Sequence, residues 1–286
     1  MSHNNPFIVS ADWLESQLGA SDIHIIDASW YLPKANRNGR LEYSRSHIPE
    51  AVFFDHDLLS DPNSSLPHTL PDAEYFAKAL GALGINEKNT IVVYDGDGFF
   101  SAPRAWWLLR LMGAEKVYVL DGGFKTWQQE GRPVTSNDTI ITPKIFNANA
   151  DLTKVVLIDE MRGIVGDGNV AIADARGKKR FSGEEKEPRE GVRSGHMPNA
   201  QNVPYSLLSD EGKFKSNEEI FGIFKSAGID PLAPVVTTCG SGVTAAVLTL
   251  ALQGLGNENV RLYDGSWSEW GSLVDSSVVT DEDLEM

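Results

Sequence analysis

Short runs of apolar residues alternate along the chain with stretches in which apolar residues recur three or four positions apart. The short runs are rich in β-branched and aromatic residues and mostly close on Asp or Gly, which is typical of buried strands. The longer stretches have the spacing of helices with one buried face. The pattern predicts strands at 24–29, 51–55, 90–95, 116–122, 170–175, 200–205, 234–239 and 260–265, and helices at 72–84, 101–113, 217–228 and 242–256.

Strands that are apolar on both faces and alternate with helices predict an α/β fold, with a mainly parallel sheet covered by helices on both faces. Ser216 and Glu219 have the spacing of a capping box, which marks the start of the helix at 217–228. The longest apolar run, Val243 to Leu250, is far shorter than the roughly 18–20 residues of a membrane span. No membrane partner is therefore expected.

Four landmarks occur in the same order in both halves of the chain. The pairs are Asp27 and Asp174, His47 and His196, Asp95 and Cys239, and Trp127 and Trp270. Their separations all lie between 143 and 149 residues, so the chain is a duplicated domain with small insertions between equivalent elements. We expect an N-terminal domain over 1–138, a linker over 139–150 and a C-terminal domain over 151–286.

The composition of the 286 residues, with 41% hydrophobic and 23% charged, is that of an ordinary globular protein. A net charge of −15 argues against a nucleic acid partner or an anionic membrane surface, because both need clustered Lys and Arg. The N-terminal residues show no secretory signal pattern, so a cytoplasmic location is expected. The single cysteine, Cys239, excludes an internal disulfide and any site built from several cysteines.

Cys239 ends an apolar strand and begins the loop C-G-S-G-V-T, which leads into a helix. In open α/β sheets, ligands bind beyond the carboxyl ends of the strands. Gly240 and Gly242 allow the loop to curl so that its backbone N–H groups point inward as an anion nest, which favours a thiolate. A lone cysteine is usually a small buried apolar residue. Its position at a strand end in a glycine-rich turn instead favours a nucleophile.

Three other chemistries of such loops can be compared with the residues present. A phosphate-binding NTPase loop needs G-K-[ST], which the chain lacks. A cysteine phosphatase loop closes on Arg, whereas Thr244 and Ala245 stand here. A cysteine protease needs a histidine near the thiol in space, which the sequence leaves open. The loop is best suited to a small anion bound through sulfur.

Several motifs together resemble the tandem-domain rhodanese superfamily of sulfurtransferases, and within it the branch whose sulfur donor is 3-mercaptopyruvate. The motifs are DASWYLPK at 27–34, HIP at 47–49, SAPRAWW at 101–107, LDGG at 120–123, RF at 180–181, EPREG at 187–191, GH at 195–196, CGSGVTA at 239–245 and YDGSWSEW at 263–270. The resemblance implies two rhodanese-like domains, of which the first is inactive and has Asp95 at the cysteine position. It implies no metal and no organic cofactor. The neutral loop after Cys239 is that of the mercaptopyruvate branch, because thiosulfate-specific members typically carry basic residues there.

The resemblance also implies which residues bind the anionic substrate. Arg180 and Arg189 map to the two arginines that hold its carboxylate and keto groups. Between 176 and 193 there are seven Lys or Arg residues and four Glu, a local surplus of positive charge in an acidic chain. The substrate-binding residues expected in the cysteine loop are Gly240, Gly242, Val243 and Thr244.

A proton relay proposed for the family maps to Ser241, His68 and Asp57. His68 and Asp57 belong to the expected first domain, so this relay implies a site between the domains. From the sequence alone, a loop histidine such as His68, between two prolines, is more often a turn residue; only the resemblance gives it a role. A relay suits the reaction because the carbon that loses sulfur must gain a proton and an incoming thiol must lose one.

The expected activity is sulfur transfer from 3-mercaptopyruvate, with release of pyruvate, through a persulfide on Cys239. The expected acceptor is cyanide, a small thiol or a thioredoxin-like protein. One alternative is a thiosulfate:cyanide sulfurtransferase. Another is a tandem rhodanese module that binds partners without catalysis.

Overall fold

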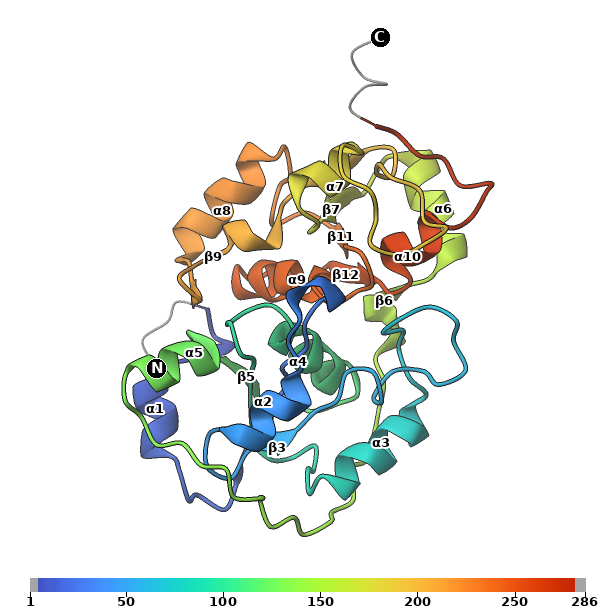
Figure 1. The fold of residues 1–286 in the computed structure, drawn as a ribbon. Coiled ribbons are helices and arrows are strands. Elements are labelled where there is room, and N and C mark those ends of the chain that lie inside the picture. The colour runs from blue at the N-terminus through green and yellow to red at the C-terminus, as the bar shows by residue number, and fades with distance from the viewer. Residues whose placement is uncertain (1–4, 281–286) are drawn as a thin grey trace. The chain divides into compact units, whose positions relative to one another are not determined.

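The computed structural model describes residues 5–280, which form two units (Figure 1). Unit 1 comprises the chain up to Pro62 together with 70–152 and 209–214, and unit 2 comprises 63–69, 153–208 and the chain from Lys215. These boundaries differ from the expected ones. The segment 139–150 belongs to unit 1, where Lys144 donates its N–H to Gly81 and Phe146 is buried. Two short segments, 63–69 and 209–214, belong to the unit formed mainly by the other half of the sequence.

Unit 1 is built on a five-stranded parallel sheet in the order β1-β5-β4-β2-β3. Its strands are β1 (Ile8–Val9), β2 (Ile23–Asp27), β3 (Val52–Phe53), β4 (Thr90–Tyr94) and β5 (Val117–Leu120). Its helices are α1 (Ala11–Ser16), the 3-10 helix η1 (Pro33–Ala35), α2 (Gly39–Arg45), α3 (Ala73–Ala82), α4 (Ala102–Leu111) and α5 (Gly123–Gln129). The unit also contains an antiparallel hairpin of β9 (Ser209–Asp210) and β10 (Lys213–Phe214).

Helices cover both faces of this sheet, which explains why its central strand β4 is apolar and buried from its second residue onward. Val92 and Tyr94 of β4 lie in a core cluster with Leu14 of α1 and Trp127 of α5. Residues between them along the strand point to the opposite face. Helix α4 is buried along almost its whole length and packs against β4 and β5. The strand is therefore enclosed from both sides, as its sequence predicts.

Unit 2 repeats this arrangement with a five-stranded parallel sheet in the order β6-β12-β11-β7-β8. Its strands are β6 (Val155–Val156), β7 (Ala171–Asp174), β8 (Ala200–Asn202), β11 (Val235–Thr238) and β12 (Val260–Tyr263). Its helices are η2 (Leu152–Lys154, which begins in unit 1), α6 (Ile158–Asp167), α7 (Lys178–Ser182), η3 (Tyr205–Leu207), α8 (Asn217–Ser226), α9 (Ala245–Gly254) and α10 (Ser266–Trp270). The predicted α/β class with two parallel-sheet domains is confirmed.

The two faces of the second sheet are covered by different helices. Val236 of β11 packs with Met161 of α6 and Trp267 of α10, whereas the next residue, Thr237, reaches the hydroxyl of Thr249 in α9 at 2.9 Å. The predicted capping box at Ser216 is present at the start of α8. None of the helices between residues 5 and 280 combines the length and apolar character needed to cross a membrane.

Candidate active site

Cys239 lies at the carboxyl end of β11, the central strand of the second sheet, and the loop that follows leads into α9. Its side chain is buried, with 2% of its surface exposed. Gly242 has a φ of 78°, and its counterpart in unit 1, Gly98, has a φ of 80°. Glycine adopts this left-handed conformation without a steric penalty, so the glycine lets each loop turn back toward its own strand end.

The start of α10 is hydrogen-bonded to the cysteine loop. The carbonyl of Cys239 accepts the N–H of Trp267 at 2.9 Å, and its own N–H donates to Oγ of Ser266 at 3.3 Å. The N–H of Ser268 donates to the carbonyl of Gly240 at 2.8 Å. Sequence reasoning misses these three positions as site residues, although the repeated motif that contains them was a usable signal.

Asp95 shows what the equivalent loop of unit 1 binds. Its buried carboxylate accepts five backbone N–H groups, those of Asp97, Gly98, Phe100, Ser101 and Ala102, at 2.5–3.2 Å. Burial raises the pKa of Asp95, and the hydrogen bonds from the backbone oppose that rise. Successive N–H groups that converge on one carboxylate form an anion nest. The nest of unit 1 is therefore filled by a side chain of its own loop.

In unit 2 the same loop has a thiol where unit 1 has a carboxylate. Within residues 5–280, no protein group accepts the backbone N–H groups of Gly240, Ser241, Gly242, Val243 and Thr244. These are the four loop residues expected to bind substrate, together with Ser241. The positive end of α9 adds to their partial charges. The loop can therefore receive an anion attached to, or presented to, the sulfur of Cys239.

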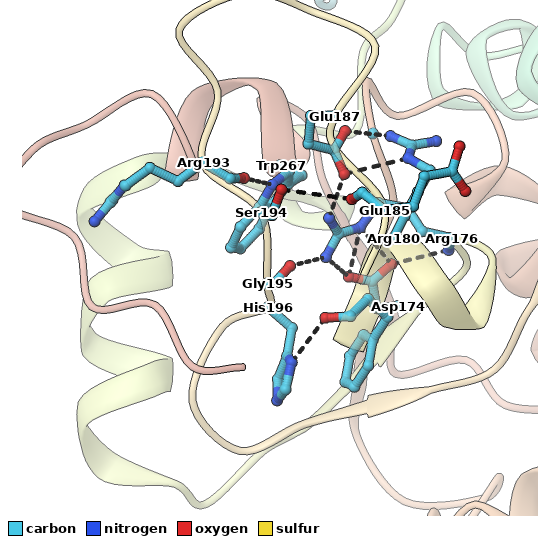
Figure 2. A network of polar contacts seen from close by, with 12 residues as sticks. Asp174, Arg176, Arg180, Glu185, Glu187, Arg193, Ser194, Gly195, His196 and Trp267 are labelled. Atoms are coloured by element: carbon cyan, nitrogen blue, oxygen red, sulfur yellow. Dashed lines mark hydrogen bonds and ion pairs between the residues drawn. The ribbon is translucent and has the colours of Figure 1, made fainter. Parts of the chain in front are cut away.

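Arg180 lies on α7, with its guanidinium against the cysteine loop. A Cβ atom added to Gly240 would lie 3.0 Å from Nη2 of Arg180, so the two residues are in direct contact. The Nε and Nη2 atoms of Arg180 donate to the carboxylate of Glu187 at 3.2 and 2.5 Å (Figure 2). The first of the two expected substrate arginines thus lies beside Gly240, the residue after Cys239, and the edge of its guanidinium formed by Nε and Nη2 is bound by a carboxylate.

Arg176 is a fully buried cation that shares the carboxylate of Glu187 with Arg180 (Figure 2). It donates to both oxygens of Asp174, to Glu187 at 2.8 Å and to the carbonyl of Gly195, and it lies over the ring of Trp267. Burial lowers the pKa of Arg176, but the two carboxylates raise it more, so the net direction is upward. Sequence reasoning misses Arg176 and Glu187, because a count of charges does not tell which of them are paired.

Arg189 reaches the loop through α10. Its Nη1 donates to Oγ of Ser268 at 3.2 Å, and that hydroxyl donates to the carbonyl of Gly240 at 2.5 Å. Both expected substrate arginines therefore converge on Gly240, the residue next to the thiol. Exposed Lys178 and Lys179, by contrast, lie on the solvent side of α7.

Ser241 and His68 are brought together within unit 2. Both are buried, and Oγ of Ser241 lies 3.0 Å from Nδ1 of His68. His68 has a φ of 58°, a strained conformation for a residue other than glycine. Asp57 is exposed in a turn of unit 1, where its N–H donates to Asp55. The structure therefore brings Ser241 and His68 together, whereas the role of Asp57 stays a prediction.

The sequence profile of the rhodanese-like domain matches residues 10–130 and 157–273. The chain is 44% identical over 273 residues to a 3-mercaptopyruvate sulfurtransferase of Escherichia coli, which covers 95% of this chain and 97% of that protein. It is 40% identical to thiosulfate/3-mercaptopyruvate sulfurtransferase 1 of Arabidopsis thaliana, over 94% of this chain and 76% of that protein. The crystal structure of SseA from Escherichia coli superimposes with a TM-score of 0.85 at 42% identity, covering 91% of this chain and 98% of that one. The chain therefore belongs to the rhodanese family, with two rhodanese-like domains in tandem.

Proposed function

We propose that this protein transfers sulfur from 3-mercaptopyruvate to a thiophilic acceptor through a persulfide on Cys239, and that it releases pyruvate. One observation carries the proposal: the only thiol of the chain precedes five backbone N–H groups that have no protein acceptor among residues 5–280, and Arg180 lies against the neighbouring Gly240. The relatives named for 3-mercaptopyruvate support the choice of donor.

In the first half-reaction the Cys239 thiolate attacks the sulfur of 3-mercaptopyruvate. An S–S bond forms and the C–S bond breaks, so the electron pair of that bond stays on carbon as an enolate. Arg180 and Arg189 are placed to bind the carboxylate and keto oxygens, and a planar guanidinium suits both. The open N–H groups of the loop stabilise the negative charge on the outer sulfur of the persulfide.

The enolate carbon becomes the methyl group of pyruvate by gaining the proton that the donor thiol has lost. The Ser241 hydroxyl and His68, 3.0 Å apart, can pass that proton from sulfur to carbon. We further propose Asp57 as the third member of this relay. In the second half-reaction an acceptor thiolate or cyanide attacks the outer sulfur and regenerates the Cys239 thiolate.

Unit 1 serves as a non-catalytic partner domain in this proposal, because Asp95 has no nucleophilic sulfur and already fills its own nest. The acceptor is cyanide, a small thiol or a thioredoxin-like protein. The cytoplasmic location stays a prediction from the sequence.

Intact-mass measurement after addition of 3-mercaptopyruvate tests the mechanism. The wild-type protein should gain one sulfur atom, about 32 Da, and release one equivalent of pyruvate. Cys239→Ser should do neither, and pyruvate release by that variant would contradict the mechanism. A wild-type protein that gains no sulfur would instead support a binding module.

The ratio of kcat/KM for the two donors decides between the donor alternatives. We expect 3-mercaptopyruvate to be preferred, since no basic side chain in the loop faces a second negative charge. A clear preference for thiosulfate would favour the thiosulfate:cyanide sulfurtransferase.

A further inference from the structure

We propose that Glu187 determines donor specificity at the Cys239 site. It would do so by fixing the direction of the Arg180 guanidinium and by balancing its charge, so that a singly charged donor is preferred over a doubly charged one. The inference rests on the proposed function, since it concerns how that same site selects its substrate.

The carboxylate of Glu187 is shared between two arginines. Oε1 accepts Nη1 of Arg176 at 2.8 Å and Nε of Arg180 at 3.2 Å, and Oε2 accepts Nη2 of Arg180 at 2.5 Å. Only 4% of the Glu187 side chain is exposed. Contacts of an ionised group in such a buried position are strong and costly to break.

Arg176 cannot move to follow a displaced Glu187, because it is anchored to the sheet. Its guanidinium is bound to both oxygens of Asp174, which is the last residue of β7, and to the carbonyl of Gly195. The orientation of Arg180 is therefore set from the sheet through Arg176 and Glu187, rather than by the short helix α7 alone.

This contact decides which edge of Arg180 meets the substrate. Glu187 occupies the edge formed by Nε and Nη2, while the end formed by Nη1 and Nη2 lies 3.8 and 3.0 Å from the Cβ position of Gly240. A planar donor group binds a carboxylate well only when its direction is fixed. Without Glu187, the guanidinium would lose that fixed direction.

The charges of the cluster also select among donors. Arg176 and Arg180 are balanced by Asp174 and Glu187, so these four side chains carry no net charge. Arg189, whose Nη1 donates to Ser268 beside the carbonyl of Gly240, lies on the same part of the loop. Thiosulfate carries two negative charges, and because Glu187 already neutralises Arg180, these four side chains offer no surplus positive charge for the second one. An unpaired charge of this kind disfavours the wrong ligand.

Glu187→Gln tests the proposal, with kcat/KM measured for both donors at one ionic strength. Glu190→Gln is the matched control, because it removes the same charge from an exposed position in the same loop. We expect the preference for 3-mercaptopyruvate over thiosulfate to fall by roughly tenfold or more in Glu187→Gln and by less than about twofold in the control. An unchanged preference, or an equal loss with both donors, would overturn the inference.

Pyruvate release by the wild-type protein distinguishes failure of this inference from failure of the proposed function. If the wild-type protein does not release pyruvate from 3-mercaptopyruvate, the proposed function fails whatever the variant does. If it does release pyruvate and the preference is unchanged in Glu187→Gln, only the inference fails.

Glu187→Asp provides a second test should the glutamine variant not fold, because it keeps the charge and withdraws the carboxylate by one methylene. We expect KM for 3-mercaptopyruvate to rise by roughly fivefold, since the shorter side chain cannot bridge both arginines, while thiosulfate stays a poor donor. An unchanged KM would overturn the positioning role, and a gain with thiosulfate would overturn the charge effect.

Discussion

The hydroxyl of Ser241 lies 3.0 Å from Nδ1 of His68, two residues along the loop from the Cys239 thiol. The two residues are 173 positions apart in the sequence, and both are buried in unit 2. His68 keeps its strained left-handed backbone in this position. Strain of this kind persists where the surrounding structure enforces it, often at functional sites.

Ser241→Ala and His68→Asn should each slow pyruvate release, because either change interrupts proton transfer to the enolate carbon. We expect kcat to fall by roughly 100-fold, and the double variant to lose little more than either single one. Steady-state pyruvate production measures this. Losses that multiply in the double variant would show that the two residues act independently.

Asp95→Ala should destabilise unit 1, because five N–H groups in the loop would lose a charged acceptor. We expect the free energy of unfolding to fall by roughly 3–5 kcal/mol. Urea denaturation followed by tryptophan fluorescence measures it. Asp95→Asn is the matched control: it keeps one oxygen acceptor, so its loss should be smaller. An alanine variant as stable as the wild type would contradict the role given to the carboxylate.

The stability of the protein should depend on the ionisation of Asp27. Burial raises the pKa of this carboxyl from 3.8 to about 6, against weaker opposing hydrogen bonds from Ser29 and Tyr94. Between these values the folded state binds more protons than the unfolded state. The stabilisation by protonated Asp27 is therefore fully present below pH 3.8 and is lost progressively as the pH rises from there through about 6.

Asp27→Asn removes this dependence, because the amide stays neutral and can still accept the N–H of Ser29. We expect the variant to gain up to roughly 3 kcal/mol relative to the wild type at pH 7.5, and only roughly 1 kcal/mol at about pH 4.5. Urea unfolding of both proteins at both pH values is the measurement. An equal difference at the two pH values would show that Asp27 does not titrate in this range.

Arg176→Gln should unfold unit 2 more easily, because it leaves two buried carboxylates, Asp174 and Glu187, with one cation fewer. We expect a loss of roughly 3–5 kcal/mol. The exposed Lys178 on the same short segment is the control, and Lys178→Gln should change stability by less than about 0.5 kcal/mol. Equal effects of the two changes would show that the buried network adds no stability.

The central elements could be predicted from the sequence because their patterns are long and unambiguous. Strand β4 is apolar at successive positions, and α8 starts at a capping box. Strands β1 and β6 have two residues each, too few to show any period, and the hairpin of β9 and β10 is equally short. Helices α7 and α10 have five residues each and show no helical repeat. These elements are defined by pairing and packing, which a local pattern does not contain.

The candidate site also contains some residues that the sequence could predict and others that it could not. Cys239 could be found locally, because a strand end, a glycine turn and a helix start are adjacent in the sequence. The proximity of His68 to Ser241 is a long-range contact, and only the family resemblance pointed to it. Arg176 adds to the positive surplus of its segment, yet the structure places it inside, paired with Asp174. Pairing depends on three-dimensional distance and burial. The sequence could therefore not distinguish the buried, paired Arg176 from Arg180, which lies at the cysteine loop.

The backbone N–H groups that follow Cys239 link the occupancy of the site to the stability of unit 2. A bound anion that satisfies them stabilises the folded state in proportion to how well it fits, by ordinary binding linkage. The persulfide form of unit 2 should therefore resist unfolding more than the form with a free thiol. The sulfur atom in transfer and the stability of the domain that holds it are in this way linked through the same loop.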